Sequence, residues 1–295
     1  MSLGQTILPY IISGISVGGQ YSLIAIGYTM VYGILRLINF AHGDVFMVAG
    51  LMMVYLAAAL PLYIAIPLVI LFTVLLGFTI ERVAYRPLRT APRMSVMISA
   101  IGVSYLLENL ATYLTGGLAK AYPEIPVLKT THVIGSMTVK TITIVTPLLT
   151  LILVVALVCF IKYTKIGMAM RAVSKDFDTA RLMGIKVNAV ISSTFVIGSF
   201  LAGVGSILYF TNYGQVSPLI GAMPGLKAFV AAVFGGIGSI PGAVLGAFII
   251  GICESFIKAN DSIAIFSNAF TFALLIAVLL FKPNGMFGEK LTEKV

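Results

Sequence analysis

Charged side chains are scarce in this sequence of 295 residues, of which Asp, Glu, Lys and Arg make up 10% and hydrophobic residues 59%, with a mean hydropathy of +1.07. A soluble domain would need several times more polar residues to cover its surface. Alternating ten-residue strand patterns are also missing, whereas apolar runs of about 20 residues, the length of a membrane-spanning helix, recur along the chain. The composition therefore predicts an integral membrane protein with an all-α fold, a polytopic bundle of transmembrane helices.

Residues that carry chemistry are equally few. Cys159 and Cys253 both lie within apolar runs, far from any polar loop that could hold a disulfide framework or a metal ligand set. The two histidines have no acidic neighbours at ligand spacing, and no G-x-x-x-x-G-K-[ST] phosphate-binding motif occurs. We therefore expect no enzyme activity, no catalytic residue, no metal and no cofactor on this chain, so that any nucleotide hydrolysis must come from another polypeptide.

Acidic residues are outnumbered, 10 against 19 basic ones, which gives a formal net charge of +9. In a soluble protein this charge would suggest a nucleic-acid partner. Here the basic residues stand beside the ends of apolar runs, as in loops that set the topology of a membrane protein, so we expect surrounding lipid and no nucleic acid. The N-terminus also lacks the basic region and cleavage site of a signal peptide, so the first apolar run is expected to stay in the mature protein.

Hydropathy and loop charge place about eight spans, with broken or re-entrant helices among them. Because no charge precedes Arg36, the N-terminus is expected outside. The C-terminal tail, with Lys282, Lys290 and Lys294, is expected in the cytoplasm. The clear spans cover residues 8–32, 63–80, 96–114, 143–161, 190–210 and 263–281.

Two further segments are fixed by this topology. Residues 116–140 fall outside, where they are expected to form a small cap or hairpin. Residues 225–257 must begin and end on the same side, which predicts two short spans or a re-entrant pair with its turn at FGGIGSIPGA.

Gly14 and Gly18 in the first span form a small-residue face that lets another helix approach closely.

Two stretches interrupt the hydrophobic pattern: NFAHGD, with Asn39 and His42, and GGIGSIPG, with Gly235, Gly236 and Gly238. Irregular backbone at membrane depth is tolerated only where it faces protein or water. The stretches are consistent with two structural repeats whose breaks meet near the membrane centre, where half-helix dipoles would face a zwitterionic solute. For the first stretch, an ordinary cytoplasmic turn capped by one of its polar residues is an equally good interpretation.

The span at 96–114 places Glu108 and Asn109 in the membrane, with Ser104 and Thr112 on the same helical face as the glutamate. A membrane glutamate normally faces a cavity or a partner. Glu108 and Asn109 are therefore candidates for a translocation pathway. A packing contact with a neighbouring helix is the other interpretation, and the sequence favours it because no array of buried acids accompanies Glu108.

The stretch from Lys162 to Asn188 is long, polar and basic, and it is set between two strongly apolar runs. Its excess of Lys and Arg predicts a cytoplasmic location. Asp176 can cap a short helix that carries Phe177, Ala180, Met183 and Gly184 on one stripe. Such a helix, lying outside the bilayer, would offer a small apolar face to another molecule.

Three separated runs carry a family likeness: GGQYSLIAIGYTMVYGILRLINFAHGDVFMVAG, IGMAMRAVSKDFDTARLMGI and VAAVFGGIGSIPGAVLGA. In this order they resemble the permease subunits of bacterial branched-chain amino acid ABC importers, specifically the shorter, H-type permease. The resemblance covers residues 18–285. It implies one transmembrane permease domain over residues 1–295, with a cytoplasmic coupling loop at 162–189.

In ABC importers a loop with an EAA-x-x-x-G pattern forms the coupling helix that contacts the ATPase. Asp178, Thr179, Ala180 and Gly184 look like this pattern, with Asp in place of Glu and Thr in place of the first Ala. The resemblance implies a second homologous permease subunit, two cytoplasmic ATP-binding subunits and a periplasmic amino-acid-binding protein as partners. It also implies a location in the bacterial inner membrane and half of a translocation pathway for leucine, isoleucine or valine.

Two other functions fit the sequence. An ion-coupled secondary transporter would use Glu108 and Glu254 as proton carriers, although such proteins usually show more than isolated buried acids. A passive solute channel, or a permease for urea or short amides, fits the glycine-rich breaks. The channel leaves the basic stretch unexplained, whereas urea and amide permeases belong to the same family, so the substrate rests on the resemblance alone.

Overall fold

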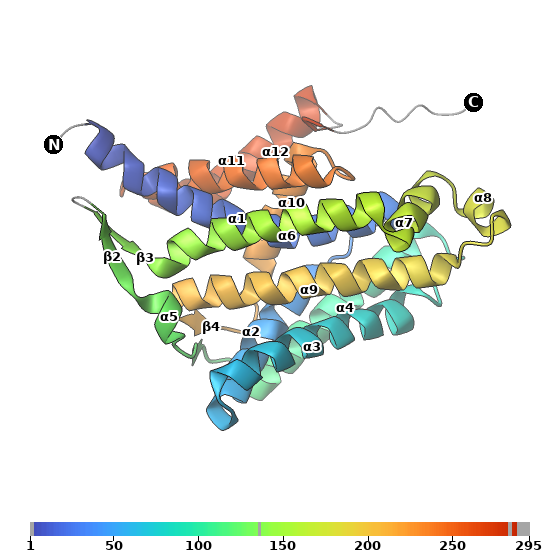
Figure 1. Cartoon of the computed structure of the whole chain (residues 1–295), viewed down its shortest axis with the longest axis horizontal. Coiled ribbons are helices and arrows are strands. Elements are labelled where there is room, and N and C mark those ends of the chain that lie inside the picture. Colours follow the sequence, from blue (N-terminus) through green and yellow to red (C-terminus); the bar gives the residue numbers. More distant parts are fainter. Residues whose placement is uncertain (1–2, 135–136, 283–284, 288–295) are drawn as a thin grey trace.

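The computed structural model describes residues 3–134, 137–282 and 285–287, most of them in long helices that run along one axis (Figure 1). Within these residues, eight helices are long and apolar enough to cross a bilayer, as the sequence predicted. Lys290 and Lys294 of the expected cytoplasmic tail lie outside the described residues. The long helices are α1 (Leu3–Leu35), α2 (His42–Ala59), α3 (Leu62–Ile80), α4 (Arg93–Thr115), α6 (Thr141–Tyr163), α9 (Val187–Tyr213), α11 (Ile240–Lys258) and α12 (Ser267–Phe281).

Helix α1 lies at the centre of the bundle and packs against α6, α9, α10 (Ala222–Gly235) and α11. Glycine makes the tightest of these approaches possible. A Cβ atom on Gly14 would lie 2.6 Å from the Cα of Ile252, and one on Gly18 would lie 2.6 Å from the Cα of Phe248. The expected small-residue face of the first span is therefore confirmed as the surface that receives α11.

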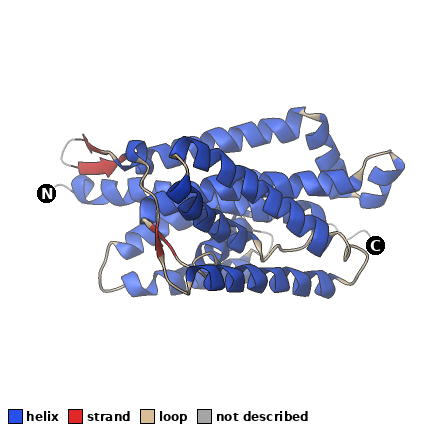
Figure 2. Cartoon of the chain, turned by 90° about the horizontal axis from the view of Figure 1, so that it is seen from below, coloured by secondary structure: helices blue, strands red, loops and turns tan. Residues whose placement is uncertain are grey.

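Short strands gather towards the end of the bundle at which α1 begins (Figure 2). Strands β2 (Thr131–Ile134) and β3 (Met137–Lys140) pair antiparallel, which confirms the expected hairpin. Strand β1 (Lys120–Ala121) pairs with β4 (Gln215–Val216), and the short helix α5 (Pro126–Lys129) lies between β1 and β2. We call this the hairpin end.

The opposite end, which we call the α8 end, carries the helices α7 (Lys165–Lys175) and α8 (Phe177–Leu182). The π-helical turn η1 (Glu81–Tyr85) extends α3 towards this end, and the 3₁₀ turn η2 (Ala264–Phe266) precedes α12 near the hairpin end. Nearly all connections between long helices lie at one of the two ends, as expected of a membrane-spanning bundle.

The turn predicted within residues 225–257 is present: it joins α10 to α11, and of these two helices only α11 is a candidate span. Helix α10 has 14 residues, a length of about 21 Å, too short to cross a bilayer. Gly235 and Gly242 lie backbone to backbone, because a Cβ on either would collide with the carbonyl of the other. In the turn, Gly236 and Gly238 have φ values of 106° and 99°, which only glycine adopts readily.

Candidate functional site

Helix α2 begins deep inside the bundle rather than at its end. The His42 ring lies against Gly27, which stands eight residues, or about 12 Å, before the end of α1. The centroid of the His42 ring is 5.0 Å from that of the Tyr28 ring, and His42 is 2% exposed. The chain from Arg36 to Ala41 therefore turns back into the bundle before α2 starts, so the broken-helix interpretation of NFAHGD holds and the ordinary turn does not.

The start of α2 meets the start of α10. A Cβ on Gly43 would lie 2.8 Å from the carbonyl oxygen of Gly221 and 3.2 Å from the Cα of Gly225. Just before them, Leu219 has a φ of 75°, and its N–H donates to Met47 Sδ of α2 at 3.3 Å. Two helix N-termini, each with a positive dipole end, thus lie side by side within the bundle. We call this contact the α2–α10 junction.

The stretch that meets NFAHGD is therefore Ser217–Gly221 and not GGIGSIPG, which corrects the expected pairing of the breaks. Gly238 of the GGIGSIPG turn instead lies beside Gly33, near the end of α1. The physical reason is the length of α10: since this helix does not cross the bilayer, its interruption lies at its start. Gly235, Gly236 and Gly238 form the turn at its other end.

Polar side chains around the first break are held by partners from other helices. Asn39 Oδ1 accepts a hydrogen bond from the Tyr85 hydroxyl at 2.8 Å, and Asp44 Oδ2 accepts one from Ser104 at 2.5 Å. Further along α4, Glu108 is half-buried, and Asn109 is exposed and donates to the backbone carbonyl of Tyr105 at 2.7 Å. Ser104, one turn before Glu108, thus ties α4 to the start of α2 beside the first break.

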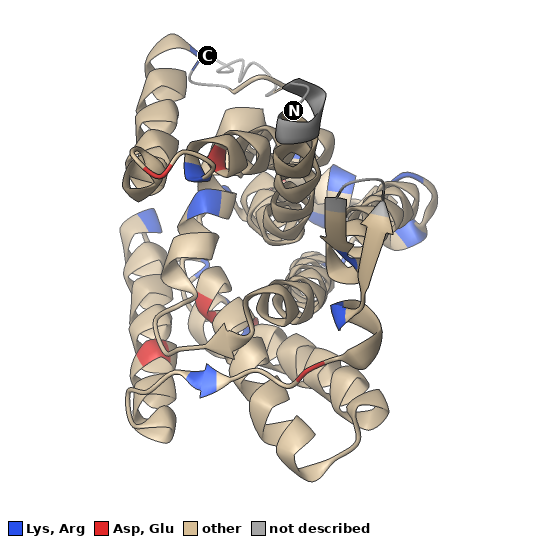
Figure 3. Ribbon diagram, turned by 90° about the vertical axis from the view of Figure 1, so that its left-hand side faces the viewer, with Lys and Arg blue, Asp and Glu red and all other residues tan. Residues whose placement is uncertain are grey.

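A buried ionic cluster joins α1, α10 and α11. Glu254 Oε1 accepts from Lys227 Nζ at 2.7 Å and from Lys258 Nζ at 2.6 Å, while Glu254 Oε2 accepts from the Tyr21 hydroxyl at 2.9 Å. The side chains of Glu254 and Lys227 are 1% and 6% exposed. Charged residues are sparse among the ribbons of the bundle (Figure 3), so the pairing is a rare internal charge contact. A glutamate held by two lysines is typical of a fixed ion pair rather than of a proton carrier.

The basic stretch folds into two short helices at the α8 end. Thr164 caps α7, since its hydroxyl accepts from the Gly167 N–H at 3.0 Å. Asp176 caps α8, as predicted: its carboxylate accepts from the N–H groups of Asp178 and Thr179 at 2.8 and 3.0 Å. The amphipathic helix α7, which buries Gly167, Met170 and Val173, was not predicted, although these residues follow helical spacing.

Gly184 ends α8. Its φ is 79°, the Ile185 N–H donates to the Ala180 carbonyl at 3.0 Å, and the Gly184 N–H donates to the Arg181 carbonyl at 2.9 Å. This is the Schellman pattern, in which a glycine in the left-handed conformation satisfies the last helical carbonyls. The backbone conformation at the end of α8 therefore explains why the last residue of the EAA-like pattern, Gly184, is a glycine.

The exposed apolar face of α8 differs from the predicted stripe. Ala180 is 3% exposed and, with the half-buried Phe177, packs into the core below the helix. Leu182 and Met183 instead face outward, with exposed fractions of 88% and 78%. The predicted stripe correctly placed Met183 outside but assigned two inward-facing residues to the free surface, because spacing alone cannot tell which side of a short helix is covered.

A hydrogen-bonded chain connects the start of α9 with the end of α3. Arg89 donates to both Glu81 of η1 and Asn188 of α9, and Ser192 of α9 donates to Glu81 Oε2 at 2.6 Å. Glu81 is fully buried, and burial lowers the pKa of the Arg89 guanidinium, an effect that the Glu81 carboxylate opposes. We call these four residues the Glu81 link.

A comparison with protein families places this architecture among known membrane proteins. Residues 10–279 match the model of the permease component of branched-chain amino acid transport systems. The chain belongs to this permease family. The permease is thus a multi-pass membrane protein, in agreement with its eight candidate spans in the described residues.

Individual relatives agree with the family assignment. The permease is 42% identical to the high-affinity branched-chain amino acid transport system permease protein LivH of Escherichia coli strain K12, over 98% of this chain and 97% of the relative. It is 40% identical to the corresponding protein BraD of Pseudomonas aeruginosa, over 98% of both. A more distant relative, the autoinducer 2 import system permease protein LsrC of Yersinia enterocolitica, is 27% identical. No solved structure matches the permease.

Sequence reasoning missed three groups of residues that the fold of the permease brings together. The first is Lys227, the buried partner of Glu254. It is a single charge inside an apolar run, and such a charge could have indicated a buried ion pair. The Glu81 link joins residues that are far apart in the sequence, so no spacing could reveal it. Gly43 and Gly221 were separated by 178 positions and carried no signal beyond being glycines near breaks.

Proposed function

We propose that the chain is the permease subunit of an ATP-driven importer for leucine, isoleucine and valine in the bacterial inner membrane. It forms half of the translocation pathway within a single domain, residues 1–295, and pairs with a second homologous permease. Two cytoplasmic ATP-binding subunits supply the energy, and a periplasmic binding protein delivers the amino acid. The N-terminus lies outside and the C-terminus in the cytoplasm, which makes the hairpin end periplasmic and the α8 end cytoplasmic.

One observation carries the coupling part of this proposal: α8 is a capped helix that exposes two large apolar side chains at its C-terminal end, beside the exposed Asp178 and Arg181. Leu182 and Met183 are almost fully exposed, although both ends of α8 are fixed by hydrogen bonds. Large exposed apolar side chains beside a defined backbone are typical of a protein contact. We assign the coupling loop to residues 162–189, with Asp178, Thr179, Ala180 and Gly184 shaping α8 and the side chains of Leu182 and Met183 contacting the ATPase.

The Glu81 link supplies a route by which a push on α8 would reach the membrane helices. Residues 183–186 connect α8 to α9, and Asn188 and Ser192 of α9 are tied through Arg89 and Glu81 to the end of α3. Because both contacts of the buried Glu81 are at least half-buried, α8, α9 and α3 would move together when the ATP-binding subunits close. Alternating access would then follow from a tilt of α3 and α9 against the rest of the bundle.

The pathway is proposed to pass the α2–α10 junction, where two helix N-termini supply positive dipole ends for a carboxylate. Asn39 and His42 lie beside this junction. Glu108 and Asn109 mark a level nearer the hairpin end, and Gly235, Gly236 and Gly238 mark the level of the α8 end. Residues at successive depths along the pathway would contact the amino acid transiently as it crosses, rather than hold it in one tight binding site.

Replacing both Leu182 and Met183 with serine tests the coupling assignment. We expect the variant to fold normally, because both side chains are exposed, but to lose co-purification with its ATP-binding subunits and leucine uptake into vesicles. The matched control is the Val127→Ser, Val133→Ser variant, which changes two side chains that are each 75% exposed towards the hairpin end. Uptake at the wild-type rate in the Leu182, Met183 variant would reject the assignment.

Glu81→Gln is expected to separate ATPase binding from transport. The change removes the negative charge that balances the half-buried Arg89, which should destabilise the fold by about 3 kcal/mol. The ATP-binding subunits should still co-purify, since α8 is unchanged, while uptake per ATP hydrolysed falls. The measurement compares hydrolysis and leucine uptake in the same vesicles, and an unchanged ratio would contradict the role of the Glu81 link.

A further inference from the structure

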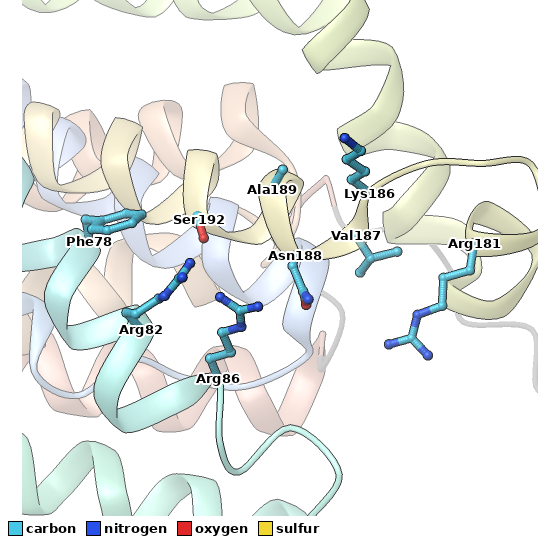
Figure 4. A pocket seen from close by; sticks show the side chains of 9 residues that line it. All are labelled: Phe78, Arg82, Arg86, Arg181, Lys186, Val187, Asn188, Ala189 and Ser192. Atoms are coloured by element: carbon cyan, nitrogen blue, oxygen red, sulfur yellow. The ribbon is translucent and has the colours of Figure 1, made fainter.

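The described part of the chain contains a pocket at the α8 end that borders the proposed coupling loop and the Glu81 link. It has a volume of about 610 Å³ and lies between α3 with η1 on one side and the start of α9 on the other. Figure 4 shows Arg82 and Arg86 directed towards α9, where Asn188 and Ser192 line the opposite wall. The full lining consists of Phe78, Arg82, Arg86, Arg181, Lys186, Val187, Asn188, Ala189 and Ser192.

The charge of this pocket is of one sign. Four of its lining residues are basic and none is acidic. Within the described residues, Arg82, Arg86 and Lys186 form no salt bridge, and Arg181 is paired only with the exposed Asp178 at 3.7 Å. The buried Glu81 carboxylate nearby is already engaged by Arg89 and Ser192. Unbalanced positive charge in a concave, half-open site predicts an anionic ligand.

An exposed apolar stripe leads from the membrane into the pocket. Leu71, Leu75 and Phe78 follow one another on a single face of α3 and are 54%, 54% and 37% exposed. Arg82 continues the same face by one more turn, and its guanidinium lies 6.0 Å from the Phe78 ring centroid. A soluble anion needs no such stripe, whereas a lipid needs an apolar surface for its acyl chain directly beside the site for its headgroup.

We propose that this pocket binds the headgroup of an anionic phospholipid, with one acyl chain lying along the stripe of Leu71, Leu75 and Phe78. Arg82 and Arg86 contact the phosphate, and Asn188 and Ser192 offer hydrogen bonds to the glycerol part of the headgroup. A bound lipid would bridge the end of α3 and the start of α9. The site is distinct from the translocation pathway, although Arg181, Lys186 and Asn188 of the proposed coupling loop line it.

The test measures lipid binding to the full chain in detergent by native mass spectrometry, with palmitoyl-oleoyl phosphatidylglycerol as the probe. We expect the wild-type chain to retain this lipid and not phosphatidylcholine, and inorganic phosphate not to displace it. The Arg82→Gln, Arg86→Gln variant should bind phosphatidylglycerol about 30-fold more weakly, since each basic residue near an anionic lipid contributes roughly a factor of five. The Arg82→Lys, Arg86→Lys variant keeps the charge and should keep most of the binding.

The matched control is the Arg36→Gln, Arg93→Gln variant, which removes two exposed charges outside the pocket lining and should bind as the wild type does. Circular dichroism confirms that each variant retains its helices. Equal binding of phosphatidylglycerol to the glutamine variant and the wild type would overturn the proposal, as would displacement by inorganic phosphate or equal retention of phosphatidylcholine. Unchanged lipid binding together with lost co-purification of the ATP-binding subunits would identify the pocket as a protein contact instead.

Discussion

The Glu254→Leu variant is expected to lose about 3–5 kcal/mol of folding free energy, enough to leave little folded protein. The reason lies in Lys227, whose side chain is 6% exposed and whose ammonium contacts the glutamate at 2.7 Å. Without the carboxylate, a positive charge remains inside the bundle with no anion to balance it. The chain contains no tryptophan, so unfolding in detergent is best followed by circular dichroism.

A second change should reverse most of this loss. In the Glu254→Leu, Lys227→Met double variant the buried charge is gone, and apolar side chains of similar volume fill the space. Lys258→Gln is the control, because that side chain is 47% exposed and its loss leaves Glu254 paired with Lys227, so this variant should lose much less stability. If the single and double variants were equally unstable, the ion pair would not be the cause, and a packing defect beside Tyr21 would explain the loss.

Structural elements that depend only on residues close together in the sequence could be predicted from the sequence alone. The Asp176 cap, the hairpin within residues 116–140 and the turn at FGGIGSIPGA each depend on neighbours a few positions apart, and each is present in the structure. The number of spans follows from hydropathy in the same way.

Contacts between distant segments could not be predicted from one sequence. The EAA-like pattern located α8, but which side of α8 is free depends on how it packs against α7 and α9. Tyr21 and Glu254 are 233 positions apart, and the pairing of NFAHGD with Ser217–Gly221 depends on the depth at which α10 begins. The pairing of the breaks was therefore predicted incorrectly, since glycine content drew attention to GGIGSIPG, where the glycines serve the tight turn between α10 and α11.

Gly221→Val is expected to abolish leucine uptake by forcing the α2–α10 junction apart. A Cβ at this position would collide with the backbone carbonyl of Gly43, and the next nearest atom is the Cβ of Met47 at 2.9 Å. Backbone atoms cannot rotate away as a flexible side chain can, so the loss of stability should reach about 3 kcal/mol or more. The φ of Gly221 is −65°, which valine adopts without strain, so the whole effect comes from the collision. Uptake is measured in vesicles with the complete importer.

Gly102→Val is the control, because a Cβ on Gly102 meets no atom within 4 Å and the residue lies on the exposed side of α4. This variant should retain uptake within about a factor of two of the wild type. A graded series at Gly221 sharpens the test further: alanine already brings the colliding Cβ, so Gly221→Ala should lose most of the activity that valine loses. Near-normal uptake by Gly221→Ala would mean that α2 and α10 can separate without harm, and the junction would then have no place in the translocation pathway.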